Sequence, residues 1–362
     1  MEEKLKVALI HDDLVQWGGA ERVLAVLAEI FPDAPIYTSV YDWDNPLITS
    51  HFPRERVRTS FIQKIPGWRS FYKALFFLHP LSFESFDFTG YDLVFSQTTR
   101  FAKSIITKPK TVHVCYCHTP PRFLWHFSGE KPPAILSLLL NTFRIYDQAS
   151  SQRVDFWLAG SKNAQKRLKK IYRVESELLY PFVDTDSFQD TEPFDGGYLL
   201  VVSRLNGYKR VDLAVKAATK LRLPLKIVGV GPKENDLRKM AGPTVDFVGR
   251  VSEITLRDLL SGCRALLVTA EEDFGLTPLE AMACGKPVIA FGQGGVLETV
   301  VEGKTGYFFA EQNEDAVLDA LAKLDRKGYN QKECLRVAQQ FSKTQYIRQF
   351  RKLLAPRLDM KS

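Results

Sequence analysis

The residues best suited to chemistry lie between positions 271 and 295, where two glutamates flank the start of an expected helix. Glu272 and Glu280 stand with seven residues between them. Gly275 permits a tight turn after a buried strand, and Pro278 fits the first turn of a helix because it needs no N–H partner there. Free N–H groups at such a helix start attract anions, so the segment predicts a phosphate site.

The two carboxylates need a different partner, because they would repel a phosphate placed between them. Sugar hydroxyls suit this role, since an ionised carboxylate only accepts hydrogen bonds and a hydroxyl donates one. The alternative is a capped helix with a solvent-exposed glutamate. Together, Glu272 and Glu280 favour a site that holds both a phosphate and a sugar.

A second candidate site carries cations at the end of the expected strand 198–203. Arg204 and Lys209 lie five positions apart in the loop that follows it. An arginine supplies a fork of donors and a lysine a point charge, a combination suited to a diphosphate. Alone, this pattern is typical of a surface charge pair; beside the glutamate segment it indicates a nucleotide diphosphate.

The first half of the chain repeats the arrangement of strand, glycine turn and helix. Gly18 and Gly19 follow the expected strand 6–11, and their N–H groups could meet a β-phosphate or an acceptor oxygen. His118 stands at the carboxyl end of another expected strand, where a reacting group would sit. The alternatives are an ordinary turn and a core or solvent histidine.

These sites need a frame of parallel strands, and the sequence predicts one. Continuous apolar runs, typical of strands buried on both faces, alternate with helical patterns along almost the whole chain, which indicates an α/β fold. The expected strands span residues 6–11, 35–41, 91–97, 111–117, 154–159, 198–203, 225–230, 245–248, 265–269, 287–291 and 306–309.

A domain boundary follows a short strand-like run at 178–180. A polar, turn-rich stretch comes next, so we expect a linker near 184–197. At roughly 150 residues per domain the chain makes two domains, which we place at 1–184 and 195–341. Ligands of such sheets bind beyond the carboxyl ends of the strands, so two facing domains would enclose a cleft. The tail 333–354 has the pattern of a helix.

The bulk composition is that of an ordinary globular enzyme with anionic partners. Hydrophobic residues make up 45% and charged residues 25% of the chain, enough for a large core without a metal or disulfide. The net charge of +7 favours a nucleotide diphosphate or anionic lipid, whereas no nucleic-acid-binding motif accompanies it. Five cysteines without metal-ligand spacing favour reduced thiols, with Cys115 and Cys117 in the core. We expect no signal peptide and no membrane-spanning stretch.

Two basic stretches are candidates for contact with a membrane surface. The first, 56–77, interleaves cations with aromatic residues, and the second, 162–173, carries six cations and no acid. Basic aromatic helices are typical of interfacial segments. The alternatives are a buried helix pair with a basic exposed side for the first stretch and a solvated helix face for the second. The first stretch favours an acceptor-facing or lipid-facing role.

On these residues the chain resembles family 4 of the retaining glycosyltransferases, which have the GT-B fold. The matching residues are the E-x7-E segment Glu272–Glu280, Arg204 and Lys209, Gly18 and Gly19, and His118. The resemblance covers essentially the whole chain. The segments 115–122 and 203–210 are similar to the mannosyltransferase-like branch of bacterial polysaccharide and O-antigen assembly.

The resemblance implies two Rossmann-like domains that face each other across a cleft, with a C-terminal helix, 342–362, that crosses back onto the first domain. It also implies which residues act in catalysis. Arg204 and Lys209 would bind the donor diphosphate and stabilise its departure. Glu272 would hold hydroxyls of the donor sugar, and His118 would contact that sugar near its transferred face.

The remaining donor contacts are implied by the same resemblance. Glu280 would bind the ribose hydroxyls, and Val251 would approach the base through its backbone. The turn and the helix start would hold phosphate and sugar oxygens. The donor-binding set is Gly18, Gly19, Val251, Phe274, Gly275, Leu276, Thr277 and Glu280.

The implied reaction is retaining transfer of a hexosyl group, mannosyl favoured, from a nucleotide diphosphate sugar to a glycan or lipid-linked acceptor in cell-surface polysaccharide synthesis. We expect front-face attack, with Glu272 as a nucleophile in the minor alternative. Neither a cofactor nor a metal is expected, because fixed cations meet the diphosphate. The expected location is the cytoplasm, with peripheral attachment to the inner face of the plasma membrane.

Two other classes of protein share such a frame. One is a nucleotide-sugar epimerase or a phosphorylase built on two Rossmann-like domains. The other is a non-catalytic module that binds a nucleotide sugar. Arg204, Lys209, Glu272, Glu280 and His118 together favour an enzyme, since a binding module has no need of all five.

Overall fold

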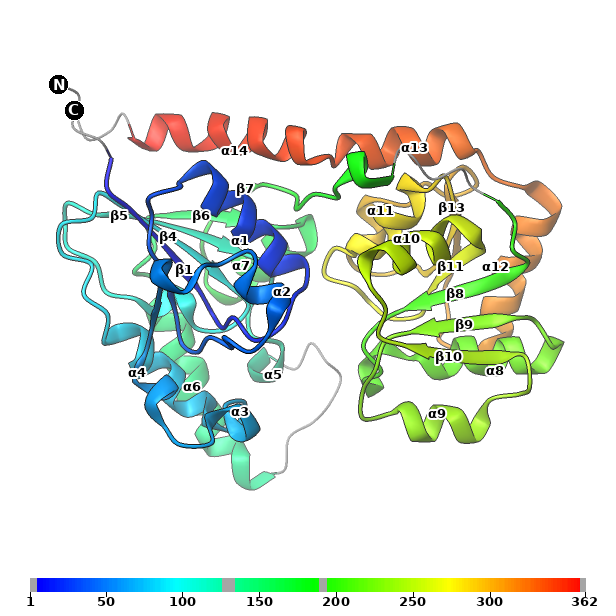
Figure 1. Ribbon diagram of the computed structural model, residues 1–362, viewed down its shortest axis with the longest axis horizontal. Helices are drawn as coiled ribbons and strands as arrows, with labels where there is room; N and C mark the ends of the chain where they lie inside the picture. The colour runs from blue at the N-terminus through cyan, green and yellow to red at the C-terminus, as the bar shows by residue number, and fades with distance from the viewer. Residues whose placement is uncertain (1–4, 126–133, 189–193, 359–362) are drawn as a thin grey trace. The chain divides into compact units, whose positions relative to one another are not determined.

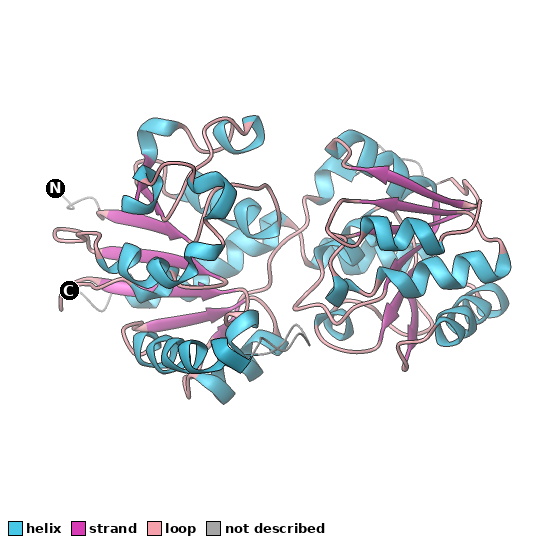
Figure 2. Cartoon of the chain, turned by 90° about the horizontal axis from the view of Figure 1, so that it is seen from below, coloured by secondary structure: helices cyan, strands magenta, loops and turns pink. Residues whose placement is uncertain are grey.

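The computed structural model describes residues 5–125, 134–188 and 194–358 (Figure 1). The chain divides into two compact units, Met1–Leu179 and Tyr180–Ser362, and each is described by itself. In both units helices lie on either side of one parallel sheet, as Figure 2 shows. The expected α/β fold class is confirmed, and the expected cleft between the units stays a prediction.

Unit 1 contains a seven-stranded parallel sheet in the order β3-β2-β1-β4-β5-β6-β7. The strands are β1 (Val7–His11), β2 (Ile36–Thr38), β3 (Val57–Thr59), β4 (Leu93–Thr98), β5 (Val112–Cys117), β6 (Phe156–Ala159) and β7 (Glu177–Leu178). The carboxyl ends of β1, β4 and β5 lie level, since Gln97 stands opposite both His11 and Tyr116. Side chains that follow these three strands therefore share one edge of the sheet.

The helices of unit 1 are α1 (Gly19–Ile30), α2 (Pro46–Thr49), α3 (Trp68–Phe71), α4 (His79–Glu84), α5 (Arg122–Trp125), α6 (Ala134–Ser151) and α7 (Lys162–Ile171). Short 3-10 turns span Arg54–Arg56, Phe61–Lys64, Ala74–Leu78 and Ala102–Ser104. α1 shows why these segments become helices: Val23, Leu24 and Leu27 recur at helical spacing and are all buried.

Unit 2 contains a six-stranded parallel sheet in the order β10-β9-β8-β11-β12-β13. The strands are β8 (Tyr198–Val202), β9 (Leu225–Val228), β10 (Val245–Gly249), β11 (Cys263–Val268), β12 (Val288–Phe291) and β13 (Gly306–Phe309). The helices are α8 (Val211–Leu221), α9 (Glu234–Met240), α10 (Glu253–Gly262), α11 (Leu276–Ala283), α12 (Glu314–Lys327), α13 (Gln331–Gln340) and α14 (Lys343–Leu358). The 3-10 turns span Thr185–Phe188, Gly207–Lys209 and Gly295–Glu298.

Both faces of the unit 2 sheet are buried, which explains its continuous apolar strands. Leu199 and Val201 of β8 belong to one buried cluster, and Leu200 belongs to another. Successive side chains of a strand point to opposite faces, so each face of the sheet needs its own cover of helices. The five cysteines are all free and buried, as expected for Cys115 and Cys117.

Several helices begin where a side chain accepts a backbone hydrogen bond. Ser161 accepts from Ala164 at the start of α7, at 2.9 Å between nitrogen and oxygen. Asn313 accepts from Ala316 at the start of α12, at 2.8 Å. Such caps satisfy N–H groups that have no partner within the helix and fix where it begins.

Each expected strand overlaps a strand of the structure, while one short strand was not expected: β3 lies in the stretch that we expected to form basic aromatic helices. The tail is helical as expected, with a break between the end of α13 at Gln340 and the start of α14 at Lys343. The carbonyl of Phe341 accepts from the amide of Val183 at 2.9 Å, so it is not used to continue the helix.

The segment that joins the two units is described only in part. Residues 189–193 of the expected linker lie outside the described residues. The division into units counts 180–183 and α14 with unit 2, where the rings of Phe182 and Tyr346 lie 5.3 Å apart. Across the part of the chain that the structure describes, no helix is long and apolar enough to cross a membrane.

Candidate active site

The predicted cations and glutamates of unit 2 lie in the loops that follow two neighbouring strands. β8 and β11 run side by side and in parallel, so their carboxyl ends meet at one edge of the sheet. The loop after β8 carries Arg204 and Lys209, and the loop after β11 carries Glu272. This edge is where open parallel sheets bind their ligands.

Lys209 and Glu272 form a close ion pair at that edge. The lysine Nζ lies 2.6 Å from Oε1 and 2.8 Å from Oε2 of the glutamate. Their side chains are 12% and 20% exposed, so the pair is largely withdrawn from water. The carbonyl of Lys209 accepts from Thr269 Oγ1 at 2.9 Å, which ties this turn to the end of β11. The structure therefore brings together two residues that the sequence placed in one site.

Arg204 lies on the open side of the same loop. Its guanidinium is exposed and donates to the hydroxyl of Tyr208 at 3.0 Å. An exposed fork of N–H donors beside a half-buried lysine suits an anion with several oxygens.

Glycines fix the backbone around Glu272. Gly295 donates its amide to the carbonyl of Glu272 at 2.7 Å. Gly294 has φ +75°, and a Cβ there would lie 2.3 Å from the same carbonyl oxygen. Gly275 has φ +90°, in the left-handed region. Glycine is therefore required where the chain turns on either side of this carboxylate.

α11 begins directly after this turn, with Gly275 as its N-cap. The first amides of the helix, including those of Leu276 and Thr277, have no acceptor within it and carry the positive end of its dipole. Glu280 lies one turn further along and is buried. The predicted anion-binding helix start and the second glutamate thus share one short element.

Two of the predicted donor-binding residues have side chains turned to the core. Phe274 is buried, its ring 5.3 Å from that of Tyr180 and 5.5 Å from that of Phe341. Val251 is half-buried and packs against the same cluster, two residues after the left-handed Gly249. Phe274 can therefore contact a ligand through its backbone but not through its ring. For Val251 a backbone contact with the base is what the family resemblance implies.

In unit 1, one buried glutamine joins the glycine turn to His118. Gly18 is the N-cap of α1, and Gly19 is its first residue. Nε2 of Gln97, at the end of β4, donates to the carbonyl of Ala20 at 2.7 Å and lies 2.6 Å from Nε2 of His118. The sequence analysis did not single out Gln97. Its position, a polar residue near the carboxyl end of a buried strand, could have marked it as a candidate.

Asp12 is a second residue that the sequence analysis missed, and it organises the loop after β4. Its carboxylate accepts four backbone amides, from Thr99, Arg100, Phe101 and Ala102, at 2.6, 2.9, 2.9 and 2.8 Å. Burial acts to raise the pKa of this carboxyl, but the Arg100 charge and the amides outweigh it and the net pKa is lowered. Asp12 is therefore held as a carboxylate that shapes the loop.

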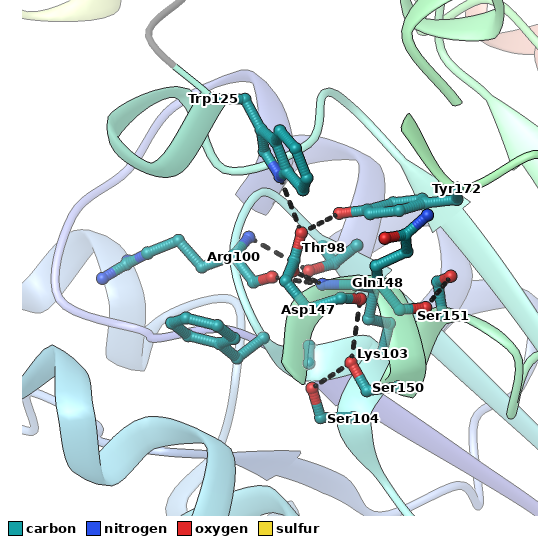
Figure 3. A network of polar contacts seen from close by, with 12 residues as sticks. Thr98, Arg100, Lys103, Ser104, Trp125, Asp147, Gln148, Ser150, Ser151 and Tyr172 are labelled. Carbon is teal, nitrogen blue, oxygen red and sulfur yellow. Dashed lines mark hydrogen bonds and ion pairs between the residues drawn. The ribbon is translucent and has the colours of Figure 1, made fainter. Parts of the chain in front are cut away.

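A buried ion pair continues this network toward three helices (Figure 3). Lys103 pairs with Asp147 of α6 and donates to the carbonyl of Arg100 at 2.8 Å. Asp147 also accepts from Trp125 Nε1 of α5 at 2.8 Å and from the hydroxyl of Tyr172, just past α7, at 2.7 Å. The side chains of Lys103 and Asp147 are both fully buried. No pattern in the sequence marked these residues.

The first basic stretch is only in part a free surface. Trp68 is buried, whereas Phe71 and Phe77 are exposed. Arg56 donates to the carbonyls of Phe31 and Ala34 at 3.0 Å, beyond the end of α1. The expected basic aromatic helices are therefore only partly a free surface, because Trp68 and Arg56 pack into the unit.

Arg69 is also engaged, in ion pairs with Asp42 and Asp44 at 2.9 and 2.6 Å. Lys64 and Lys73 remain exposed on the same stretch. Arg56 and Arg69 of this stretch are therefore engaged within the protein, and fewer cations are available to a membrane than the sequence suggests.

Two units of this kind, each a parallel sheet with glycine turns at its carboxyl edge, fit the GT-B class of fold. Sucrose-phosphate synthase from Thermosynechococcus elongatus superposes with a TM-score of 0.76 at 18% identity, covering 99% of this chain and 100% of that one. HepE from Anabaena, solved in complex with UDP, gives 0.72 at 19% identity, with 97% and 100% covered. At these identities the likeness shows the fold alone.

Family models cover both units. Residues 17–187 match the model for Glycosyltransferase Family 4, and residues 183–341 match that for glycosyl transferases group 1. The chain belongs to the family 4 glycosyltransferases. It is also 27% identical over 373 aligned positions to the alpha-1,3/1,6-mannosyltransferase ALG2 of Dictyostelium discoideum, covering 84% of this chain and 86% of that protein. The resemblance drawn from the sequence is thereby confirmed.

Proposed function

We propose that this glycosyltransferase moves a hexosyl group, mannosyl, from a nucleotide diphosphate sugar to a glycan or lipid-linked acceptor, with retention of configuration. The observation that supports it most is the Lys209–Glu272 pair at the edge where α11 begins. A cation for phosphate and a carboxylate for sugar hydroxyls stand there side by side. The mannosyl assignment rests on the likeness to ALG2 mannosyltransferases.

The cations act on the leaving group in this proposal. As the bond between C1 of the sugar and the phosphate oxygen breaks, negative charge grows on the nucleoside diphosphate. Arg204, Lys209 and the amides that open α11 stabilise this charge from fixed positions. Because these groups replace a metal, we propose that the reaction needs neither a metal nor another cofactor.

Retention follows from attack on the same face that the diphosphate leaves. The acceptor oxygen forms its bond to C1 as the phosphate departs, and the acceptor proton passes to a phosphate oxygen. Glu272 already contacts Lys209 through both of its oxygens, which favours binding of sugar hydroxyls over nucleophilic attack. We assign His118 of unit 1 to the catalytic residues on the family resemblance.

We also propose that the first basic stretch of unit 1 contacts an anionic membrane surface. Lys64, Lys73, Phe71 and Phe77 are exposed together on the first basic stretch of unit 1. A cation near an anionic bilayer gains ~1 kcal/mol, and apolar insertion adds to it. We place the enzyme in the cytoplasm, held peripherally at the inner face of the plasma membrane, where lipid-linked acceptors for polysaccharide synthesis are available.

The test of the donor assignment is calorimetric unfolding of the full chain with a panel of nucleotide diphosphate sugars in EDTA. A ligand at 100 times its Kd adds ~2.7 kcal/mol of stability, so the true donor raises the midpoint of unit 2 clearly. Glu280→Gln should weaken the shift from the bare nucleoside diphosphate, and Glu272→Gln the extra shift from the sugar. The proposal fails if no member of the panel shifts the wild-type chain, or if every shift requires added magnesium.

A further inference from the structure

Gln97 is the point at which the glycine turn, β4 and His118 meet. Its side chain is completely buried, and one atom, Nε2, contacts both the carbonyl of Ala20 and the imidazole of His118. The ring of His118 also stands edge-on to Tyr116, with centroids 4.8 Å apart. The imidazole is therefore contacted from β4 and β5, and the first turn of α1 in turn fixes Gln97.

The orientation of the Gln97 amide is set by Ala20. A carbonyl oxygen only accepts hydrogen bonds, so the amide atom 2.7 Å from it has to be the NH2 group. A flipped amide would set Oε1 of Gln97 against the carbonyl oxygen of Ala20, which is costly because two acceptors would stand 2.7 Å apart with no hydrogen between them. Assigning amide nitrogen and oxygen from the network around them is the usual physical criterion.

This orientation decides which nitrogen of His118 carries the proton. The NH2 group of Gln97 has two hydrogens: one goes to Ala20 and the other points to His118 Nε2, 2.6 Å away. A protonated Nε2 would set two donors against each other at that distance. We infer that Gln97 holds His118 as the neutral tautomer, with Nε2 as acceptor and the proton on Nδ1.

The role of Gln97 is that of a positioning residue, and it rests on the proposed function. Neutral imidazole is a donor at one nitrogen and an acceptor at the other. With Nε2 accepting from Gln97, the proton of the neutral ring is on Nδ1, so Nδ1 is the donor side of His118. Gln97 also links that donor to the glycine turn, so the two parts of the unit 1 site are placed by one side chain.

The test is nitrogen-15 NMR of the full chain labelled in histidine, with the His118 signals assigned by their loss in His118→Gln. Two-bond couplings between ring nitrogens and ring protons distinguish the tautomers. We expect the Nδ1–H form in wild type. In Gln97→Met, which has a similar length but no donor, we expect the Nε2–H form to appear. An Nε2–H or doubly protonated ring in wild type, or an unchanged ring in Gln97→Met, would overturn the inference.

Gln63→Met is the matched control, because Gln63 is a buried glutamine of the same unit that bonds the backbone of Tyr41 at both ends. It should lose stability but keep the His118 tautomer and donor turnover. Gln97→Met should lower turnover roughly tenfold, the worth of about one hydrogen bond. Equal turnover in Gln97→Met and Gln63→Met would show that Gln97 does not act as a positioning residue. If wild type turns over no nucleotide sugar, the proposed function fails while the NMR result stands.

Discussion

At the scale of single residues, the site of unit 2 is a balance of charges held close together. Lys209 is only 12% exposed and contacts both carboxylate oxygens of Glu272, whereas Arg204 is exposed and donates to the hydroxyl of Tyr208. In the proposed function, a donor diphosphate meets one cation that is already paired with a carboxylate and one exposed cation. Both are expected to matter more in the transition state than in the ground state, because the charge they face grows there.

Arg204→Ala and Lys209→Ala should each lower turnover ~100-fold or more, the usual loss for one preorganised donor in an active site. Steady-state kinetics checks this, with thermal midpoints as the measure of folding. Lys220→Ala is the control, since Lys220 pairs with Asp315 on the surface of the same unit. Near-normal turnover in either site variant would contradict the assignment.

At the scale of elements, unit 1 is organised by its buried polar network. The Lys103–Asp147 pair ties the loop after β4 to α5, α6 and the end of α7 (Figure 3). A buried pair need not stabilise a protein relative to apolar side chains, but a buried charge without its partner is strongly destabilising.

Lys103→Met should therefore destabilise unit 1 by roughly 3–5 kcal/mol, because it leaves Asp147 charged in the core. Tryptophan fluorescence in denaturant measures this directly, since all five tryptophans lie in unit 1. Lys169→Met is the control: its pair with Glu175 is exposed, so it should change stability by no more than ~1 kcal/mol. A loss in Lys103→Met no larger than in this control would show that the pair is not essential.

A buried histidine makes unit 1 sensitive to mild acid. Burial lowers the pKa of His113 from 6.5 to about 4, so the folded state keeps it neutral while the unfolded chain takes up a proton below pH 6.5. The contribution of neutral His113 to the free energy of unfolding is fully present above pH 6.5. It is lost as the pH drops toward 4, by up to about 3 kcal/mol. Tryptophan-monitored unfolding at pH 7.5 and 4.5 should show this loss.

His113→Gln isolates the contribution of this histidine, since burial lowers the pKa of His79 as well. The variant should be less stable than wild type at pH 7.5, because His113 bonds Ser96 at 2.8 Å, but its stability should depend less on pH. An identical pH dependence in both proteins would assign the effect to other groups.

The elements were more predictable from sequence than the contacts that place the site. Continuous apolar runs marked the strands because both sheet faces are buried, and the two glutamates and two cations of unit 2 were visible because they follow such runs. β3 is only three residues long and lies among aromatic residues and cations, so no alternation of apolar and polar residues revealed it as a strand. Gln97 and Asp12 act through backbone partners distant in sequence, which a single sequence does not reveal.

At the scale of the whole molecule, the two units differ in what they present to partners. Unit 2 carries the cation–carboxylate pair and the opening of α11. Unit 1 carries the glycine turn, His118 and an exposed basic and aromatic stretch. In the proposed function, unit 2 is the donor side and unit 1 the acceptor side, and the proposed contact with lipid belongs to unit 1.

The full chain should sediment with anionic vesicles and not with zwitterionic ones, and salt should weaken the binding. Lys64→Glu with Lys73→Glu should abolish it, because these lysines are exposed, whereas Arg69 already pairs with two aspartates. Lys108→Glu with Lys110→Glu makes the same charge change elsewhere on unit 1 and should leave binding largely intact. If the wild-type chain stays in the supernatant at low salt, the acceptor is a molecule in solution.

The stereochemistry of slow donor hydrolysis is the sharpest test of the proposed retaining transfer, because water takes the place of the acceptor. Proton NMR should show that the first hexose released from the nucleotide diphosphate sugar has the anomeric configuration of the donor, in the presence of EDTA. Lys209→Ala should slow this release ~100-fold or more without changing its stereochemistry. A first-formed hexose of inverted configuration would contradict retention. Release unaffected by Lys209→Ala would contradict the role of Lys209 at the leaving diphosphate.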